Sequence, residues 1–77
     1  MKTNINTNTK SEYQLKNIAW KYFISKGLAP VDHSGWALHH KDITLKDNDP
    51  VRYHQWRISD LMPMTVEDHR SYHMSLQ

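Results

Sequence analysis

The chain contains no cysteine, so disulfide bonds and zinc sites built on thiolates are excluded. No apolar run approaches the roughly 20 residues of a membrane-spanning helix, and the N-terminus lacks the hydrophobic block of a secretory signal. These absences predict a soluble, cytoplasmic protein without a membrane partner. The 77 residues suffice for one small domain with a modest core, and such domains often depend on a metal or a partner chain.

A strong net charge is also absent, because ten basic and eight acidic residues leave a formal charge of +2. The charges are unevenly placed. Residues 1–27 hold five lysines and one glutamate, a net of +4, whereas residues 28–77 hold five basic and seven acidic groups, a net of −2. A basic first third permits contact with nucleic acid phosphates without requiring it.

Residues 1–10 are polar and lack an apolar period, which predicts a flexible tail. A helix is predicted over residues 11–26, because Ser11 is a suitable N-cap and Gly27 a suitable C-terminal stop. Its apolar positions are Tyr13, Leu15, Ile18, Ala19, Trp20, Tyr22, Phe23 and Ile24. We expect residues 11–35, the helix and its connector, to support the rest of the chain. The broad apolar surface also favours a homodimer contact or another protein partner.

The chain after this connector carries strand and loop signals. Residues 36–40 predict a strand, and the polar stretch 41–49 predicts a loop. Asp49 followed by Pro50 is typical of an N-cap with proline in the first turn, which predicts a short helix over residues 50–56. A long excursion therefore separates this strand from the next extended segment.

A second strand and a final helix complete the pattern. Residues 57–64 are predicted to be extended, with Pro63 at an edge or at the end of the strand. Thr65 and Asp68 have the spacing of a capping box, so a helix is predicted over residues 66–76. The predicted fold class is α+β: an N-terminal helix, then a two-stranded hairpin and a C-terminal helix.

Histidine is unusually frequent, with six in 77 residues. His39 and His40 end the first predicted strand, where neighbouring side chains point to opposite faces, so we expect them to have different tasks. His69 and His73 lie one turn apart on the final helix and share a face. Because imidazole is a common ligand of divalent metals, the pattern predicts a metal held by His39 and His69, with His73 as a further ligand and a position open to water or phosphate.

These histidines belong to a longer series of motifs. The series consists of Leu38-His39-His40-Lys41-Asp42, Asn48-Asp49-Pro50, Asp60-Leu61-Met62-Pro63-Met64, Asp68-His69 and His73. It resembles the HNH endonucleases, also called ββα-metal or His-Me finger nucleases, over about residues 36–74, and the module is predicted to span residues 36–77.

The resemblance implies roles for the four histidines. His40 would be the general base that deprotonates water, His39 and His69 the metal ligands, and His73 a ligand or phosphate contact. It further implies a divalent metal, with Mg²⁺ or Mn²⁺ favoured over Zn²⁺ or Ni²⁺. The expected activity is metal-dependent cleavage of DNA phosphodiester bonds in a bacterial or phage-infected cell.

One motif position departs from the family pattern. The family usually has Asn before the leucine of the second strand, where this chain has Asp60. An ionised Asp accepts hydrogen bonds but does not donate them. Asp60 would therefore either orient His40 by accepting from its ring or raise the pKa of His40 and weaken it as a base.

Two functions stay open at this point. The first is a DNA endonuclease with His40 and Asp60 at its catalytic centre. The second is a catalytically weak or inactive HNH-like regulator or inhibitor that binds DNA or protein. A third interpretation is a domain that uses its metal for folding alone.

Several cations near the motifs are candidates for phosphate contacts. They are Lys41, Arg52, Arg57 and Arg70. The aromatic side chains Trp36, Tyr53 and Trp56 are expected to pack in a chain with little core, rather than to stack on bases.

Overall fold

The structure is a computed structural model, and it describes residues 10–76. The predicted flexible tail lies outside the described residues except for Lys10. The elements are α1 (Glu12–Ser25), β1 (Trp36–His40), α2 (Leu45–Asn48), α3 (Pro50–Tyr53), the 3-10 turn η2 (Ile58–Asp60), β2 (Leu61–Thr65) and α4 (Val66–Met74). This order confirms the predicted α+β class. Within residues 10–76, no helix has the length and apolarity needed to cross a membrane.

Helix α1 begins and ends on the signals that its sequence carries. The Gln14 N–H donates to Ser11 Oγ at 3.2 Å, and the Ser11 N–H donates to Gln14 Oε1 at 2.9 Å, which completes a capping box. At the other end Gly27 has a φ of +73°, and the Leu28 N–H donates to the Phe23 carbonyl oxygen at 2.9 Å. This is the helix end that a glycine in the left-handed region favours.

Strands β1 and β2 form an antiparallel two-stranded sheet. Its register pairs Trp36 with Thr65 at one end and His40 with Leu61 at the other. In a two-stranded sheet each strand has a hydrogen-bonded partner on one side only. Pro63, which has no N–H, therefore interrupts no pairing with a third strand. The pairing brings the end of β1 directly beside η2, because the Lys41 N–H donates to the Asp60 carbonyl oxygen at 2.9 Å.

The excursion between the strands differs from the predicted one. Residues 41–49 are not a plain loop, because α2 forms at Leu45–Asn48. Asp42 Oδ1 accepts from the Thr44 N–H at 3.0 Å and from the Thr44 hydroxyl at 2.6 Å, and the Leu45 side chain, 6% exposed, anchors the turn. Two apolar residues, Ile43 and Leu45, in a polar stretch are too weak a periodic signal to predict this turn.

The other differences concern where elements end. The helix predicted over 50–56 is α3, which ends at Tyr53, and Trp56 has a φ of +50°, a value that no right-handed helix permits. The segment predicted to be extended over 57–64 begins with the turn η2. Helix α4 starts at Val66 as predicted and ends at Met74, two residues before the predicted end.

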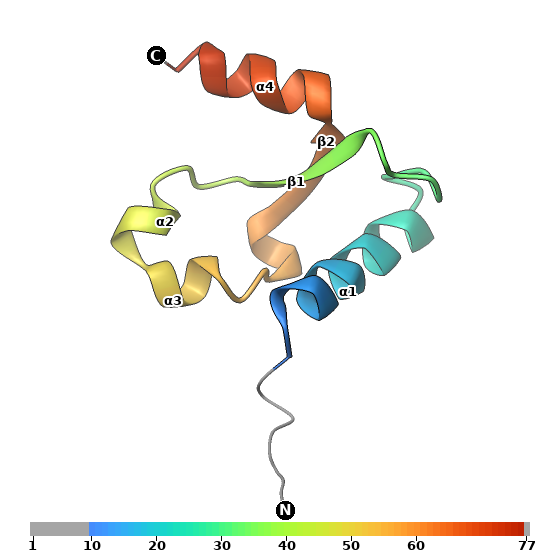
Figure 1. The fold of residues 1–77 in the computed structure, drawn as a ribbon, viewed down its shortest axis with the longest axis horizontal. Helices are drawn as coiled ribbons and strands as arrows, with labels where there is room; N and C mark the ends of the chain where they lie inside the picture. Colours follow the sequence, from blue (N-terminus) through green and yellow to red (C-terminus); the bar gives the residue numbers. More distant parts are fainter. Residues whose placement is uncertain (1–9, 77) are drawn as a thin grey trace, which may run out of the picture.

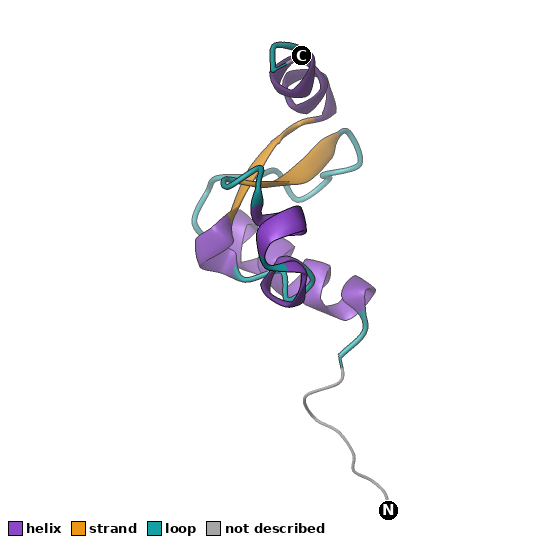
Figure 2. Cartoon of the chain, turned by 90° about the vertical axis from the view of Figure 1, so that its left-hand side faces the viewer, coloured by secondary structure: helices purple, strands orange, loops and turns teal. Residues whose placement is uncertain are grey.

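The apolar core lies on one side of the hairpin. Ala19 and Phe23 of α1 pack with Leu61 of β2, and Ala29, Leu38, Trp56 and Ile58 complete the cluster. Figures 1 and 2 show the hairpin between α1 and α4, with α2 and α3 in the segment that joins its two strands. Helix α4 lies on the other side and has no buried residue. The two faces of β1 therefore meet different surroundings.

Candidate metal centre and the adjoining pocket

Strand alternation separates the two histidines at the end of β1. The His39 ring lies among the rings of His69, Tyr72 and His73 on α4, at centroid distances of 5.3, 4.6 and 5.7 Å. The His40 ring instead lies against Tyr53 and Trp56. Both side chains are buried, with 3% and 8% of their surface exposed. The two rings thus lie on opposite faces of β1, as strand alternation predicts, and the expected difference in their tasks stays a prediction.

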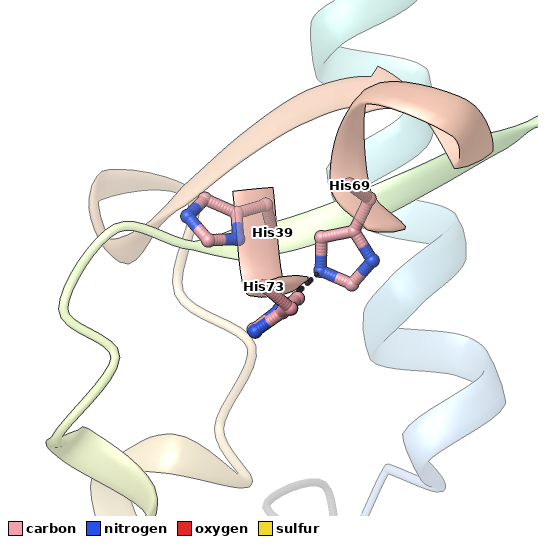
Figure 3. Close-up of side chains that lie close together, drawn as sticks. All are labelled: His39, His69 and His73. Atoms are coloured by element: carbon pink, nitrogen blue, oxygen red, sulfur yellow. Dashed lines mark hydrogen bonds between the residues drawn. The ribbon is translucent and has the colours of Figure 1, made fainter. Parts of the chain in front are cut away.

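His39, His69 and His73 converge on one point from two elements (Figure 3). Each offers a ring nitrogen, and these three nitrogens lie within 4.8 Å of one another. The Nε2 atoms of His69 and His73 are 3.0 Å apart. Thr65 Oγ1 accepts from the Asp68 N–H at 3.1 Å, so this N-cap fixes where α4, the helix that carries both rings, begins.

The chemistry of this cluster fits a metal ion. The Nδ1 atom of His39 is buried and has no hydrogen-bond partner among the described residues, a state that costs free energy unless something satisfies it. Burial, and then the neighbouring histidines, lower the pKa of His39, and burial followed by His73 lowers the pKa of His69. Neutral rings keep a lone pair, which is the form that binds metals.

His40 is held in a defined tautomer. Its Nε2 atom lies 3.0 Å from the Tyr53 carbonyl oxygen, and since a carbonyl only accepts, Nε2–H is the donor. Nδ1 is then the nitrogen with the lone pair. Burial lowers the pKa of His40, although the bond to the Tyr53 carbonyl and the charge of Asp60 act in the opposite direction. Burial therefore favours the neutral ring of His40, and the charge of Asp60 does not reverse the direction of the pKa shift.

Asp60 does not contact the His40 ring by a hydrogen bond within the described part of the chain. Its two carboxylate oxygens instead accept from Arg52, Oδ2 from Nε at 2.9 Å and Oδ1 from Nη2 at 2.6 Å. The hydrogen bonds from Arg52 hold the pKa of Asp60 below its usual value. Direct orientation of the base by this carboxylate, one of the two predicted effects, is thus absent from this structure.

A pocket of about 340 Å³ lies beside the three-histidine cluster. Its lining includes both histidines of β1 as well as His69 and His73 of α4. The remaining lining residues are Leu38, Asp42, Ile43, Lys46, Tyr53 and Trp56. The predicted metal ligands and the predicted base therefore face a common space.

The predicted phosphate contacts are less close to this space. Lys41, Arg57 and Arg70 are exposed and do not line the pocket, and Arg57 Nε donates to Gln55 Oε1 at 2.6 Å. The cation that does line it is Lys46 of α2, which sequence reasoning missed. Its position depends on a helical turn inside a stretch predicted to be a loop, so no local signal identified it.

Comparison with known families, with curated proteins and with solved structures found no match to this chain. The described residues offer three converging imidazoles, a second buried histidine beside them and a lysine on the same pocket.

Proposed function

We propose that the protein is a metal-dependent DNA endonuclease of the HNH type, which hydrolyses phosphodiester bonds with His40 as the general base. The observation that carries this proposal is the shared pocket, since His40 and the three-histidine cluster line the same space of about 340 Å³. A hydrolytic site needs a Lewis acid and a base close to one phosphate, and the pocket holds residues suited to both.

His39, His69 and His73 would hold the metal. When bound, a divalent ion supplies a positive charge that polarises the scissile phosphate and stabilises the leaving 3′ oxygen. The resemblance favours Mg²⁺ or Mn²⁺, whereas three imidazole nitrogens suit a first-row transition ion better than Mg²⁺, which prefers oxygen ligands. Mn²⁺ is the ion that meets both expectations.

His40 would act through its unprotonated Nδ1 nitrogen. Nδ1 accepts a proton from water as the water oxygen attacks phosphorus and the bond from phosphorus to the 3′ oxygen breaks. The Tyr53 carbonyl oxygen, 3.0 Å from Nε2, stabilises the imidazolium that results. The lowered pKa of His40 keeps the ring unprotonated before the reaction at neutral pH.

Lysine and arginine side chains would bind the DNA backbone. Lys46 lines the pocket and is best placed to contact the phosphate next to the scissile bond. Lys41, Arg57 and Arg70 are exposed and would contact phosphates further along the strand. DNA is then the partner, and the cytoplasm of a bacterial or phage-infected cell is the expected location.

Nicking of a supercoiled plasmid tests this function directly. Wild-type protein is incubated with Mg²⁺, Mn²⁺, Ni²⁺ or Zn²⁺ and with EDTA, beside His40→Ala, His39→Ala and the control His54→Ala. His54 is a histidine with a 59% exposed side chain that does not line the pocket. We expect metal-dependent nicking that both site variants lose and the control keeps. Equal nicking by wild type and His40→Ala would refute the role of the base.

A second candidate is an HNH-like regulator that binds a protein or DNA without cleaving it. The observation that favours it is the apolar surface left open on α1, where Tyr13, Ile18 and Tyr22 are 74%, 45% and 39% exposed. The homodimer predicted through this helix would use the same surface. This candidate predicts binding in gel-shift or pull-down measurements together with no cleavage by any metal-loaded form.

A further inference from the structure

We propose that Arg52 is a positioning residue for His40. Its ion pair with Asp60 fixes the backbone of α3, and the Tyr53 carbonyl at the end of α3 holds the general base in its reactive tautomer. This inference rests on the proposed function and names a residue pair that acts on the base through the backbone.

The ion pair is bidentate, and its carboxylate is buried. Arg52 donates through Nε at 2.9 Å and through Nη2 at 2.6 Å to the two oxygens of Asp60, a carboxylate that is only 9% exposed. A guanidinium that meets a carboxylate through two parallel bonds is fixed in direction as well as in distance. The Arg52 backbone is also held, since its N–H donates to Asp49 Oδ1 at 3.2 Å.

The next residue along the chain carries this rigidity to the base. Tyr53 follows Arg52 directly, and its own N–H donates to the Asp49 carbonyl oxygen at 3.0 Å, so both residues are bonded to Asp49. The Tyr53 carbonyl oxygen lies 3.0 Å from His40 Nε2, and the two rings stack at 4.1 Å between centroids with 19° between their planes. Tyr53 therefore holds His40 by a hydrogen bond and by a ring face.

The other partner of the pair is tied to the strand that bears the base. The Asp60 carbonyl oxygen accepts from the Lys41 N–H at 2.9 Å, and Lys41 follows His40 directly. Asp60 thus bonds to the end of β1 through its backbone and to α3 through its side chain. These contacts form a closed path from His40 through Asp60, Arg52 and Tyr53 back to His40. Loss of the ion pair would therefore alter the relative position of His40 and Tyr53.

This arrangement gives a physical reason for aspartate at position 60. A carboxylate offers two oxygens to the two N–H groups of Arg52, whereas an asparagine would offer one oxygen and turn an NH₂ group toward the guanidinium. Asp60 thus suits Arg52 as a partner. The presence of Arg52 in this chain accounts for an aspartate where the family motif has asparagine.

The test uses the full chain with Arg52→Gln, Asp60→Asn, the double variant and the conservative Arg52→Lys. The control is Asp47→Asn, which alters an exposed carboxylate that does not line the pocket. We expect each single site variant to lower kcat for plasmid nicking roughly 10- to 100-fold, as a displaced catalytic group does, with KM changed less than about two-fold. The double variant should be no worse than either single one, and Arg52→Lys should recover part of the loss.

A spectroscopic measurement separates positioning from general damage. The Nε2–H proton of His40 should give an NMR signal protected from exchange in wild type and in Asp47→Asn, and lose that protection in Arg52→Gln. Metal titration should retain wild-type affinity in all variants, because the pair does not touch His39, His69 or His73.

Additive losses in the double variant, or an unchanged Nε2–H signal in Arg52→Gln, would overturn the inference. If the wild type cleaves no DNA, the nuclease proposal fails, and the NMR comparison still decides whether Arg52 positions His40. Should Arg52→Gln fail to fold, Arg52→Lys carries the test: protection of Nε2–H equal to wild type together with unchanged kcat contradicts the need for a bidentate pair.

Discussion

Removal of the metal is predicted to release helix α4 from the hairpin. Helix α4 has no buried residue, and its exposed side chains include Val66 at 42% and Met74 at 65%. The backbone contact between the Val66 N–H and the Gly35 carbonyl oxygen, at 2.9 Å, holds only its first residue. A metal shared by β1 and α4 would supply the attachment that apolar burial does not.

The size of the effect follows from linkage. A metal present at about 100 times its Kd stabilises the folded state by about 2.7 kcal/mol, if the unfolded chain does not bind it. Unfolding entropy is about 2.1 cal/mol/K per residue, or about 160 cal/mol/K for 77 residues. Dividing the stabilisation of about 2.7 kcal/mol by this entropy gives a rise in Tm of about 17 °C.

Thermal unfolding followed by circular dichroism, with Mn²⁺, Ni²⁺ or Zn²⁺ and then with EDTA, measures this rise. His39→Ala removes the buried ligand and should abolish it, whereas His54→Ala, outside the cluster, should keep it. Amide exchange in α4 should slow on metal addition more than exchange in α1. A rise in Tm of the same size in His39→Ala would refute the predicted attachment. An amide exchange rate in α4 that does not change when metal is added would refute it as well.

Three further predictions concern the base, the core and the ion pair. Burial lowers the pKa of His40, and the base must be neutral to accept a proton, so kcat/KM should fall in acid with a midpoint below 6.5, the ordinary pKa of histidine. A midpoint above 6.5 would contradict this prediction. Leu61→Ala, at a side chain only 1% exposed, should reduce the free energy of unfolding in urea by about 2–5 kcal/mol, and a loss under about 1 kcal/mol would mean that the site collapses around the deletion. The pKa of Asp60 is depressed from 3.8, so its stabilisation is complete above that pH and is lost as pH falls through the lower folded-state pKa. The stability difference between wild type and Asp60→Asn should therefore narrow in acid, and a constant difference from pH 7 to pH 2 would argue against the pair.

The elements that local signals define could be predicted from the sequence. Ser11 and Gly27 delimit α1 through bonds within a few residues, and the Thr65 cap starts α4 in the same way. Strand alternation separated His39 from His40, and helical spacing paired His69 with His73. The histidine cluster itself followed from these two periodicities and the antiparallel hairpin.

The path between the strands could not be predicted, because contacts distant in sequence determine it. Arg52 meets Asp60 eight residues later, and Tyr53 meets His40 thirteen residues earlier. Neither pairing has a local signature. Trp56 adopts a left-handed backbone with a bulky side chain, which glycine or asparagine would have signalled but tryptophan does not.

Because His39 and His40 are neighbours in the chain, the distance between the proposed metal ligand and the proposed base is partly fixed by covalent bonds. A single peptide unit joins the proposed metal ligand to the proposed base, so about 3.8 Å of covalent chain sets the spacing of their Cα atoms. When the small core fluctuates, the backbone of His39 and that of His40 move together. Positional error then arises chiefly where a second element must meet each of them, α4 for His39 and α3 for His40. A domain with few buried side chains can in this way keep a reactive geometry that its packing alone would not secure.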